Sequence, residues 1–254
     1  GAQAVLVAPA RELAELLGLL VFASQCVPRE RVQMMGMLRA FAGLQVDWIS
    51  GRVRYATGIP WSGVVLRDSF WRDLIWWRSA LEARCCWRRP AEARRQATIM
   101  ETDASDQACG AVAWVDGSRE EATLEFTRAE RRRPITWREL RGAVRVVEVW
   151  GPRLAGHSLI VDIDNTGAVG AAEKLFSKSE DMLEQVRRMV ELSDRFDLEI
   201  HPVHTPGVFL QRPDGLSRGD AAAPPRRRLS REAFVALEAR FGPFDEFIGA
   251  ESEH

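Results

Sequence analysis

Short apolar runs alternate with longer amphipathic stretches from about residue 97 to residue 219, and this order constrains the fold more than any other feature. The expected strands cover 97–103, 110–116, 121–127, 157–163 and 198–204, and the expected helices cover 137–150, 166–174, 178–195 and 212–219. Three closely joined strands indicate an antiparallel meander, and the later strand–helix alternation indicates parallel crossovers. The sequence therefore predicts an α/β domain over 97–219. Its mixed five-stranded sheet has three antiparallel strands and then two parallel ones, with helices on both faces.

The first part of the chain, residues 1–96, has a different pattern. Apolar residues recur at helical spacing in 11–24, 32–44 and 67–84, which predicts a mainly α-helical region. The last of these stretches contains Trp71, Trp76 and Trp77, which are expected as core side chains or as a platform for stacked bases. Residues 220–254 are expected to form a linker and a short helix over 230–240 that Ser230 caps.

The acidic residues that stand out by their position are Asp103, Glu139, Asp164 and Asp214. Asp103 and Asp164 close two apolar runs, whereas Glu139 and Asp214 begin two helical patterns. Carboxylates in such places suit a two-metal site that cleaves phosphodiesters, because Mg²⁺ prefers oxygen ligands and two adjacent ions need shared carboxylates. Asp162 competes with Asp164, since both side chains point to one face of the strand. We choose Asp164 because it ends the strand and is followed by Asn165.

Each of these acids also has a simpler interpretation. Asp103 alone is a residue that caps turns, and the helix dipole favours acids such as Glu139 and Asp214 in a first helical turn. These explanations are independent of one another, so the presence of all the acids in one chain favours the metal site.

The formal net charge is −1, so no overall positive field indicates a nucleic-acid partner. Arginines are nevertheless clustered at 84–95, 128–133 and 226–228. The guanidinium fork suits phosphate oxygens, and a solvated arginine-rich surface explains the clusters as well.

The cysteines form no C-x-x-C pair, which favours a reducing compartment. No apolar stretch approaches the roughly 20 residues that span a bilayer, and the N-terminal segment carries acids where a signal peptide is basic. We therefore expect an intracellular protein of the cytoplasm or nucleus without membrane contact. Its abrupt ends suggest a part of a longer protein.

Several motifs follow one another in a fixed order: Thr102-Asp103-Ala104-Ser105 with Gly110-Ala111, Trp137-Arg138-Glu139-Leu140, Asp164-Asn165-Thr166-Gly167-Ala168-Val169, and His204-Thr205-Pro206-Gly207 leading to Asp214-Gly215-Leu216-Ser217-Arg218. On these motifs, residues 97–219 resemble the ribonuclease H domain of a retroelement reverse transcriptase. The last stretch is most like that of DIRS-like and gypsy-like elements. Each motif alone is weak evidence, but their order on matching secondary structure is specific.

The resemblance implies a ribonuclease H-like fold and an endonuclease that cleaves the RNA strand of RNA–DNA hybrids. It implies two Mg²⁺ or Mn²⁺ ions, one activating water and the other stabilising the leaving 3′ oxygen. The implied metal ligands are Asp103, Glu139, Asp164 and Asp214. His204 has the place of a histidine that assists proton handling or product release. The implied nucleic-acid contacts are Ser105, Arg138, Asn165, Thr166 and Arg218.

The preceding region resembles, more loosely, the thumb and connection of the same reverse transcriptases. The sequence contains no Tyr/Phe-x-Asp-Asp motif, so we expect no polymerase activity from this chain. The expected partners are therefore an RNA–DNA hybrid and the polymerase part of a reverse transcriptase.

Two residues depart from the family pattern near the last acid. Leu210 stands where asparagine is usual, and Pro213 stands where alanine usually precedes the aspartate. These departures motivate an alternative, a catalytically silent scaffold or nucleic-acid-binding module derived from a retroelement. A transposase or integrase of the same fold is a third hypothesis. Such enzymes usually have a glutamate on the late helix, where this chain has Asp214.

Overall fold

The chain divides into two compact units in the computed structural model, Gly1–Ala91 and Glu92–His254. Within them the structure describes residues 7–24, 27, 30–42, 44–46, 53–55, 60–61, 63–83 and 96–220. The expected linker and helix of 220–254 thus lie outside the described residues, apart from residue 220. No helix in the described ranges has the length and apolarity needed to cross a membrane.

The second unit is built on a mixed five-stranded sheet. Its strands are β6 (Ala97–Ala104), β7 (Ala108–Val115), β8 (Ser118–Glu125), β9 (Ser158–Ile163) and β10 (Glu199–His204). They lie in the order β10-β9-β6-β7-β8, with β6, β7 and β8 antiparallel and both β9 and β10 parallel to β6. The predicted ribonuclease H-like architecture is confirmed, and the strand bounds differ from the predicted ones by only a few residues.

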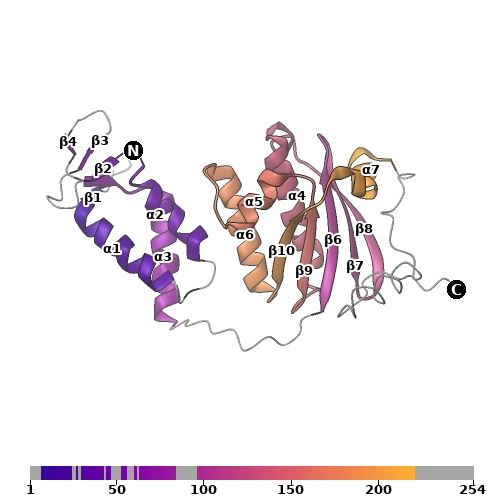
Figure 1. Ribbon diagram of the computed structural model, residues 1–254, viewed down its shortest axis with the longest axis horizontal. Helices are drawn as coiled ribbons and strands as arrows, with labels where there is room; N and C mark the ends of the chain where they lie inside the picture. Colours follow the sequence, from indigo (N-terminus) through magenta and orange to yellow (C-terminus); the bar gives the residue numbers. More distant parts are fainter. Residues whose placement is uncertain are drawn as a thin grey trace, which may run out of the picture. The chain divides into compact units, whose positions relative to one another are not determined.

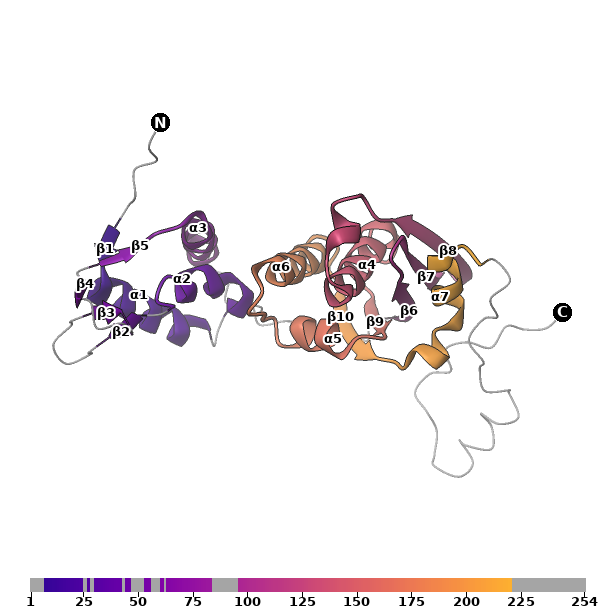
Figure 2. The same cartoon turned by 90° about the horizontal axis from the view of Figure 1, so that it is seen from above.

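Helices cover both faces of this sheet. They are α4 (Ile135–Trp150), α5 (Thr166–Glu173), α6 (Glu180–Arg195) and α7 (Gln211–Arg218). Figures 1 and 2 show α4, α5 and α6 on one side of the sheet and α7 alone on the other. At two glycines a helix and a strand lie so close together that a side chain would not fit. A Cβ on Gly142 of α4 would meet Cys109, and a Cβ on Gly110 of β7 would meet the backbone of α7.

Burial along the strands follows from this layering. The inner strand β7 is buried along nearly its whole length and consists of small or apolar residues, because helices pack on both of its faces. The edge strand β8 carries charged residues, with half of its positions exposed in alternation. Asp116 and Gly117 join β7 to β8 with positive φ angles, the conformation of a tight hairpin turn.

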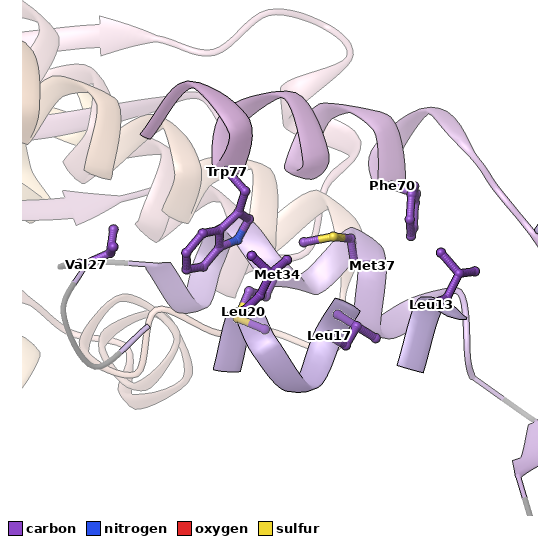
Figure 3. Close-up of a cluster of buried hydrophobic side chains, with 8 residues drawn as sticks. All are labelled: Leu13, Leu17, Leu20, Val27, Met34, Met37, Phe70 and Trp77. Atoms are coloured by element: carbon purple, nitrogen blue, oxygen red, sulfur yellow. The ribbon is translucent and has the colours of Figure 1, made fainter. Parts of the chain in front are cut away.

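The first unit contains the helices α1 (Ala10–Ala23), α2 (Met35–Arg39) and α3 (Asp68–Glu82), with a 3-10 turn over Glu30–Met34. Their apolar faces form a core of Leu13, Leu17, Leu20, Val27, Met34, Met37, Phe70 and Trp77 (Figure 3). Trp77 is buried there, and Trp71 and Trp76 pack against the same core, as the core interpretation of these tryptophans expects. The buried carboxylate of Asp73 on α3 accepts hydrogen bonds from the backbone amides of Gly36 and Met37.

The helix predicted over 32–44 is wrong in its extent. A 3-10 turn occupies its start, α2 ends at Arg39, and Leu44–Val46 forms the strand β2. This strand pairs with β3 (Val53–Tyr55), which pairs with β4 (Pro60–Trp61), while β1 (Val7–Pro9) pairs with β5 (Gly63–Val65). The last residue of the predicted helix therefore belongs to a strand instead. The hydrogen bonds of a β-ladder come from another part of the chain, so the pattern within 32–44 does not reveal them.

Candidate active site

Asp103 lies near the end of β6 and is buried. It is directly opposite Gly110 in the antiparallel register, so its side chain shares the face on which α7 packs. The hydroxyl of Ser217 on α7 lies 3.2 Å from Asp103 Oδ2 and donates a hydrogen bond to it. The first acid is thus held between the central strands and the last helix.

Glu139 lies in the second turn of α4 and is also buried. Burial raises the pKa of Glu139 to about 8, the negative charges of Asp103 and Asp164 add to the rise, and a hydrogen bond from the Ala104 amide opposes it. Its Oε2 atom has no hydrogen-bond partner within the described part of the chain. A buried carboxylate oxygen without a partner is costly and is suited to an electropositive ligand.

Asp162, in β9, and Asp164, just after it, are the two competing residues and have different surroundings. Asp162 is buried, and its Oδ1 accepts a hydrogen bond of 2.7 Å from the hydroxyl of Thr205. Asp164 lies one residue beyond the strand, and 37% of its side chain is exposed. The backbone of Gly207 approaches its carboxylate so closely that any Cβ there would clash. The structure thus places Asp162 in an internal hydrogen bond and Asp164 at the open end of the sheet.

Asp214 lies in the first turn of α7, where its amide donates to the carbonyl of Leu210 at 3.0 Å. Pro213 precedes it in the same turn, where a missing N–H costs no helical hydrogen bond. Leu210 is fully buried and immediately precedes α7, so its side chain anchors the start of the helix in the core. The two departures from the family pattern are therefore compatible with a formed α7 that packs on Gly110 of β7.

The charges of neighbouring acids act on the two buried ones, Asp103 and Glu139, at this end of the sheet. Burial raises the pKa of Asp103 to about 6, with further increases from the charges of Asp214 and Asp164, and the Ser217 hydrogen bond and Arg218 oppose the rise. The negative charges of Asp103 and Asp164 likewise raise the pKa of Glu139. Like charges that repel one another in a buried place are stabilised by a bound cation.

The residues present fit a hard divalent cation, because all of the converging donors are carboxylate oxygens and one of them is buried without a partner. Among the described residues, however, no three His, Cys, Asp or Glu side chains already have the geometry to hold one ion. The two findings are compatible, because charges act on one another over longer distances than those between a metal ion and its ligands. The carboxylates are neighbours that do not yet surround a common point.

His204 ends β10 beside this cluster. Its Nε2 lies 3.8 Å from Asp164 Oδ1, longer than a hydrogen bond, and 40% of its side chain is exposed. The histidine is therefore near Asp164 and partly open to solvent.

The five residues predicted to contact nucleic acid differ in their surroundings. The hydroxyl of Ser105 donates to the carbonyl of Ser217 at 2.7 Å and accepts from the amides of Gln107 and Ala108. All of these hydrogen bonds are made within the protein. Arg138 is buried, donates to the carbonyl of Ser105 and pairs with Asp106. Both side chains are buried and hold the loop after β6 in this structure, and Arg138 Nε is left without a hydrogen-bond partner among the described residues.

The other three predicted contacts lie closer to solvent. Asn165 accepts a hydrogen bond from the Ala168 amide and so caps α5. Thr166, the next residue, is exposed at the start of that helix. Arg218 is exposed and pairs with Asp214 across one helical turn. Of the five, Thr166 and Arg218 present their side chains at the surface.

Sequence reasoning missed the parts of Ser217 and Thr205 in this arrangement. Ser217 joins α7 to Asp103, and Thr205 holds Asp162 inside the protein. Both residues lie within the motifs described above, next to His204 and Arg218. The hydrogen-bond partner of a hydroxyl, however, cannot be identified before the fold is known.

A comparison with protein-family models finds no match for this chain, and a comparison with curated proteins finds none either. Among solved structures, an RNase H1 isolated from compost by a metagenomic approach is 19% identical, with a TM-score of 0.37, over 49% of this chain and 95% of its own. The N-terminal RNase H domain of a Mycobacterium tuberculosis protein is 15% identical, with a TM-score of 0.34, over 49% of this chain and 93% of its own.

A foamy viral protease–reverse transcriptase in complex with double-stranded DNA is 14% identical, with a TM-score of 0.34. That likeness covers 80% of this chain and 36% of the viral chain. The fold and the site described above rest on this chain's own strand order and side-chain geometry.

Proposed function

We propose that the second unit is a metal-dependent endonuclease that cleaves the RNA strand of RNA–DNA hybrids. The observation that supports this most is the electrostatic coupling of Asp103, Glu139, Asp164 and Asp214, which come from two strand ends and two helices. Buried and mutually repelling carboxylates are unfavourable for stability, and such groups concentrate where chemistry requires them.

The proposed ligands of two Mg²⁺ or Mn²⁺ ions are Asp103, Glu139, Asp164 and Asp214. Bound ions of this kind generate a nucleophilic hydroxide and stabilise the leaving oxygen of a phosphodiester. The protein holds Asp103 and Glu139 in low-polarity surroundings, where their charges interact strongly with a cation.

His204 is proposed to transfer a proton at the product end of the reaction. Its position beside Asp164 and its exposure allow exchange with solvent through Nε2. Thr166 and the amides at the start of α5 follow directly on Asp164, where helix N-termini favour a phosphate. These groups would orient the substrate without reading its sequence, which suits recognition through the minor groove and the 2′-hydroxyls.

We also propose that the chain derives from a reverse transcriptase of a DIRS-like or gypsy-like retroelement. In this proposal the first unit corresponds to the thumb and connection, and the polymerase part is a partner. The motif order of the second unit supports it, in particular the sequence from His204 to Arg218.

Cleavage of a hybrid with a 5′-labelled RNA strand, in the presence of Mg²⁺, tests the activity. The wild-type protein should yield RNA fragments with 3′-hydroxyl ends, and EDTA or Asp164→Asn should abolish them. Single-stranded RNA and double-stranded DNA serve as control substrates and should stay intact. Absence of hybrid cleavage by the wild-type protein, or undiminished cleavage by Asp164→Asn, refutes the proposal.

The second candidate function is a silent scaffold or nucleic-acid-binding module. It is favoured by the finding that no three metal-binding side chains in the described ranges already surround one point. A melting experiment separates the two candidates, because only a ligand that binds the folded state raises the melting temperature. Stabilisation by Mg²⁺ in the wild type, lost in Asp103→Asn, supports the nuclease; no stabilisation supports the scaffold.

A further inference from the structure

Two adjacent apolar side chains beside the carboxylates are unusually exposed. Val208 is 68% exposed and Phe209 is 55% exposed, the two highest values among the large apolar residues that the structure describes in the second unit. They lie in the 3-10 turn η4 (Gly207–Phe209), which connects β10 to α7. Single exposed apolar side chains are common on protein surfaces, whereas adjacent ones are typical of sites that contact a partner.

The turn is anchored on both sides, so fraying of the segment does not explain this exposure. Phe209 donates its amide to Pro206 at 2.8 Å, and Leu210 donates to Gly207 at 2.9 Å. Thr205 before the turn and Leu210 after it are both buried. Leu210 occupies the inward position, and the two residues before it point outward.

The turn is also continuous with the proposed active site. Its first residue, Gly207, lies against the Asp164 carboxylate, and the chain then leads within a few residues to Asp214. Val208 and Phe209 are therefore the exposed apolar side chains that follow directly on the residue in contact with Asp164. The turn itself carries no charged side chain, which suits a sugar or base edge better than a phosphate.

We propose that Val208 and Phe209 form an apolar contact surface for the minor-groove edge of the RNA–DNA hybrid, next to the phosphodiester at the carboxylates. This inference rests on the proposed function and adds the residues that position the substrate. The wide, shallow minor groove of an A-like helix exposes 2′-hydroxyls and base edges, and proteins that bind minor grooves commonly place apolar side chains such as Phe there.

Binding of a fluorescein-labelled RNA–DNA hybrid, followed by anisotropy with Ca²⁺ in place of Mg²⁺, tests the surface in the full-length chain. Phe209→Ala should weaken affinity by about 5-fold or more, by analogy with aromatic contacts to bases. Val208→Ala should weaken it by about 2- to 3-fold, as expected for the loss of a small apolar contact. Phe209→Leu should retain most of the affinity, because the contact is apolar and does not require a charge.

Val149→Ala is the matched control, since Val149 is 48% exposed near the other end of α4 from Glu139. It should leave affinity unchanged. The slope of affinity against salt concentration should also be the same in Phe209→Ala and wild type, because an apolar contact releases no counterions. The melting temperature with and without Ca²⁺ should match that of the wild type, which shows that neither fold nor metal binding has changed.

The outcomes are distinguishable from those of the proposed function. Equal affinity of Phe209→Ala and wild type overturns the contact surface while hybrid cleavage stands. Loss of Ca²⁺ stabilisation in both Phe209→Ala and Phe209→Leu also overturns it, because the residue would then support the metal site. Failure of the wild type to bind or cut any hybrid overturns both proposals together.

Discussion

At the scale of single residues, the candidate site contains two buried acids whose charged forms are unfavourable without a cation, together with Asp164 and Asp214, which are partly exposed. Asp103 and Glu139 are buried, and their pKa values rise for the same reasons, removal from water and the repulsion of neighbouring acids. Asp162, two residues before Asp164, instead accepts a hydrogen bond from Thr205. Two aspartates so close in the sequence therefore differ in their surroundings and in their proposed roles.

The raised pKa values predict how the metal-free protein responds to pH. A carboxyl group with a higher pKa in the folded state binds protons more tightly there than in the unfolded chain, so stability falls as pH rises. The fall should extend from the ordinary carboxyl range near pH 4 to about pH 8, the pKa of Glu139, and include that of Asp103 at about 6. In EDTA, the melting temperature should decrease by at least about 5 °C across this window.

Two comparisons check that these acids cause the decrease. Glu139→Gln should flatten the upper part of the curve, because it removes the group that titrates there. Mg²⁺ should raise the melting temperature more at about pH 8 than at about pH 5, where protons compete for the ligands. A melting temperature that is constant or rises over this range in EDTA would contradict the assignment.

The pair Asp162 and Asp164 gives a second prediction at this scale. Asp164→Asn should abolish stabilisation by Mg²⁺ while the metal-free protein keeps its melting temperature or gains a little, since a repelling charge is removed. Asp162→Asn should retain Mg²⁺ stabilisation but lower the unfolding free energy by about 1–3 kcal/mol, as a perturbed buried hydrogen bond does. Metal titrations followed by melting distinguish the two variants, and the reverse pattern would show that Asp162 is the ligand.

At the scale of elements, the site depends on how closely α7 approaches the sheet. The strand and helix patterns of 97–219 could be predicted because alternation and amphipathic periodicity are local signals. The docking of α7 could not be predicted in the same way, since it depends on Gly110 leaving room for the backbone of Pro213 and Ser217. The helix predicted over 32–44 was wrong in its extent for a related reason, since its last residue, Leu44, pairs with Tyr55 of another strand.

Gly110→Ala tests the importance of this approach. The added Cβ would lie 2.6 Å from Ser217 N and 2.8 Å from Leu216 Cβ, so α7 must shift and carry Asp214 with it. Hybrid cleavage should fall by about 100-fold, since small displacements of positioned groups have effects of that order. Circular dichroism should still show the sheet and the larger helices.

Gly170→Ala on α5 is the matched control, because a Cβ there meets nothing within 4 Å. Alanine should stabilise that helix by up to about 1 kcal/mol and leave cleavage unchanged. Equal activity of Gly110→Ala and Gly170→Ala would mean that the position of α7 does not matter for the reaction.

At the scale of the whole molecule, each of the two compact units has its own core. The core of the first unit is the cluster around Trp77, whereas the second unit buries the central strands of its sheet between helices. All the acids of the candidate site belong to the second unit. The sequence predicted these acids from motif order, but their mutual coupling, the internal roles of Ser105 and Arg138, and the exposed turn at Phe209 depend on tertiary contacts that no local pattern encodes.

A chain that begins at Glu92 should therefore fold without the first unit. It should unfold in one cooperative transition, because a single core of this size usually does, and its melting temperature should rise with Mg²⁺ as in the full chain. Melting followed by circular dichroism measures both properties. A Glu92–His254 chain that is unfolded, or that is folded but insensitive to Mg²⁺, would show that the site needs the first unit.

The central claim, that the four carboxylates form a two-metal site, is tested most directly by locating Mn²⁺ through its anomalous scattering in crystals grown with the metal and a non-cleavable hybrid. We predict two peaks roughly 3.5–4 Å apart, coordinated by Asp103, Glu139, Asp164 and Asp214. No peak at this end of the sheet, or metal ligands that exclude Asp103 and Asp214, would contradict the account.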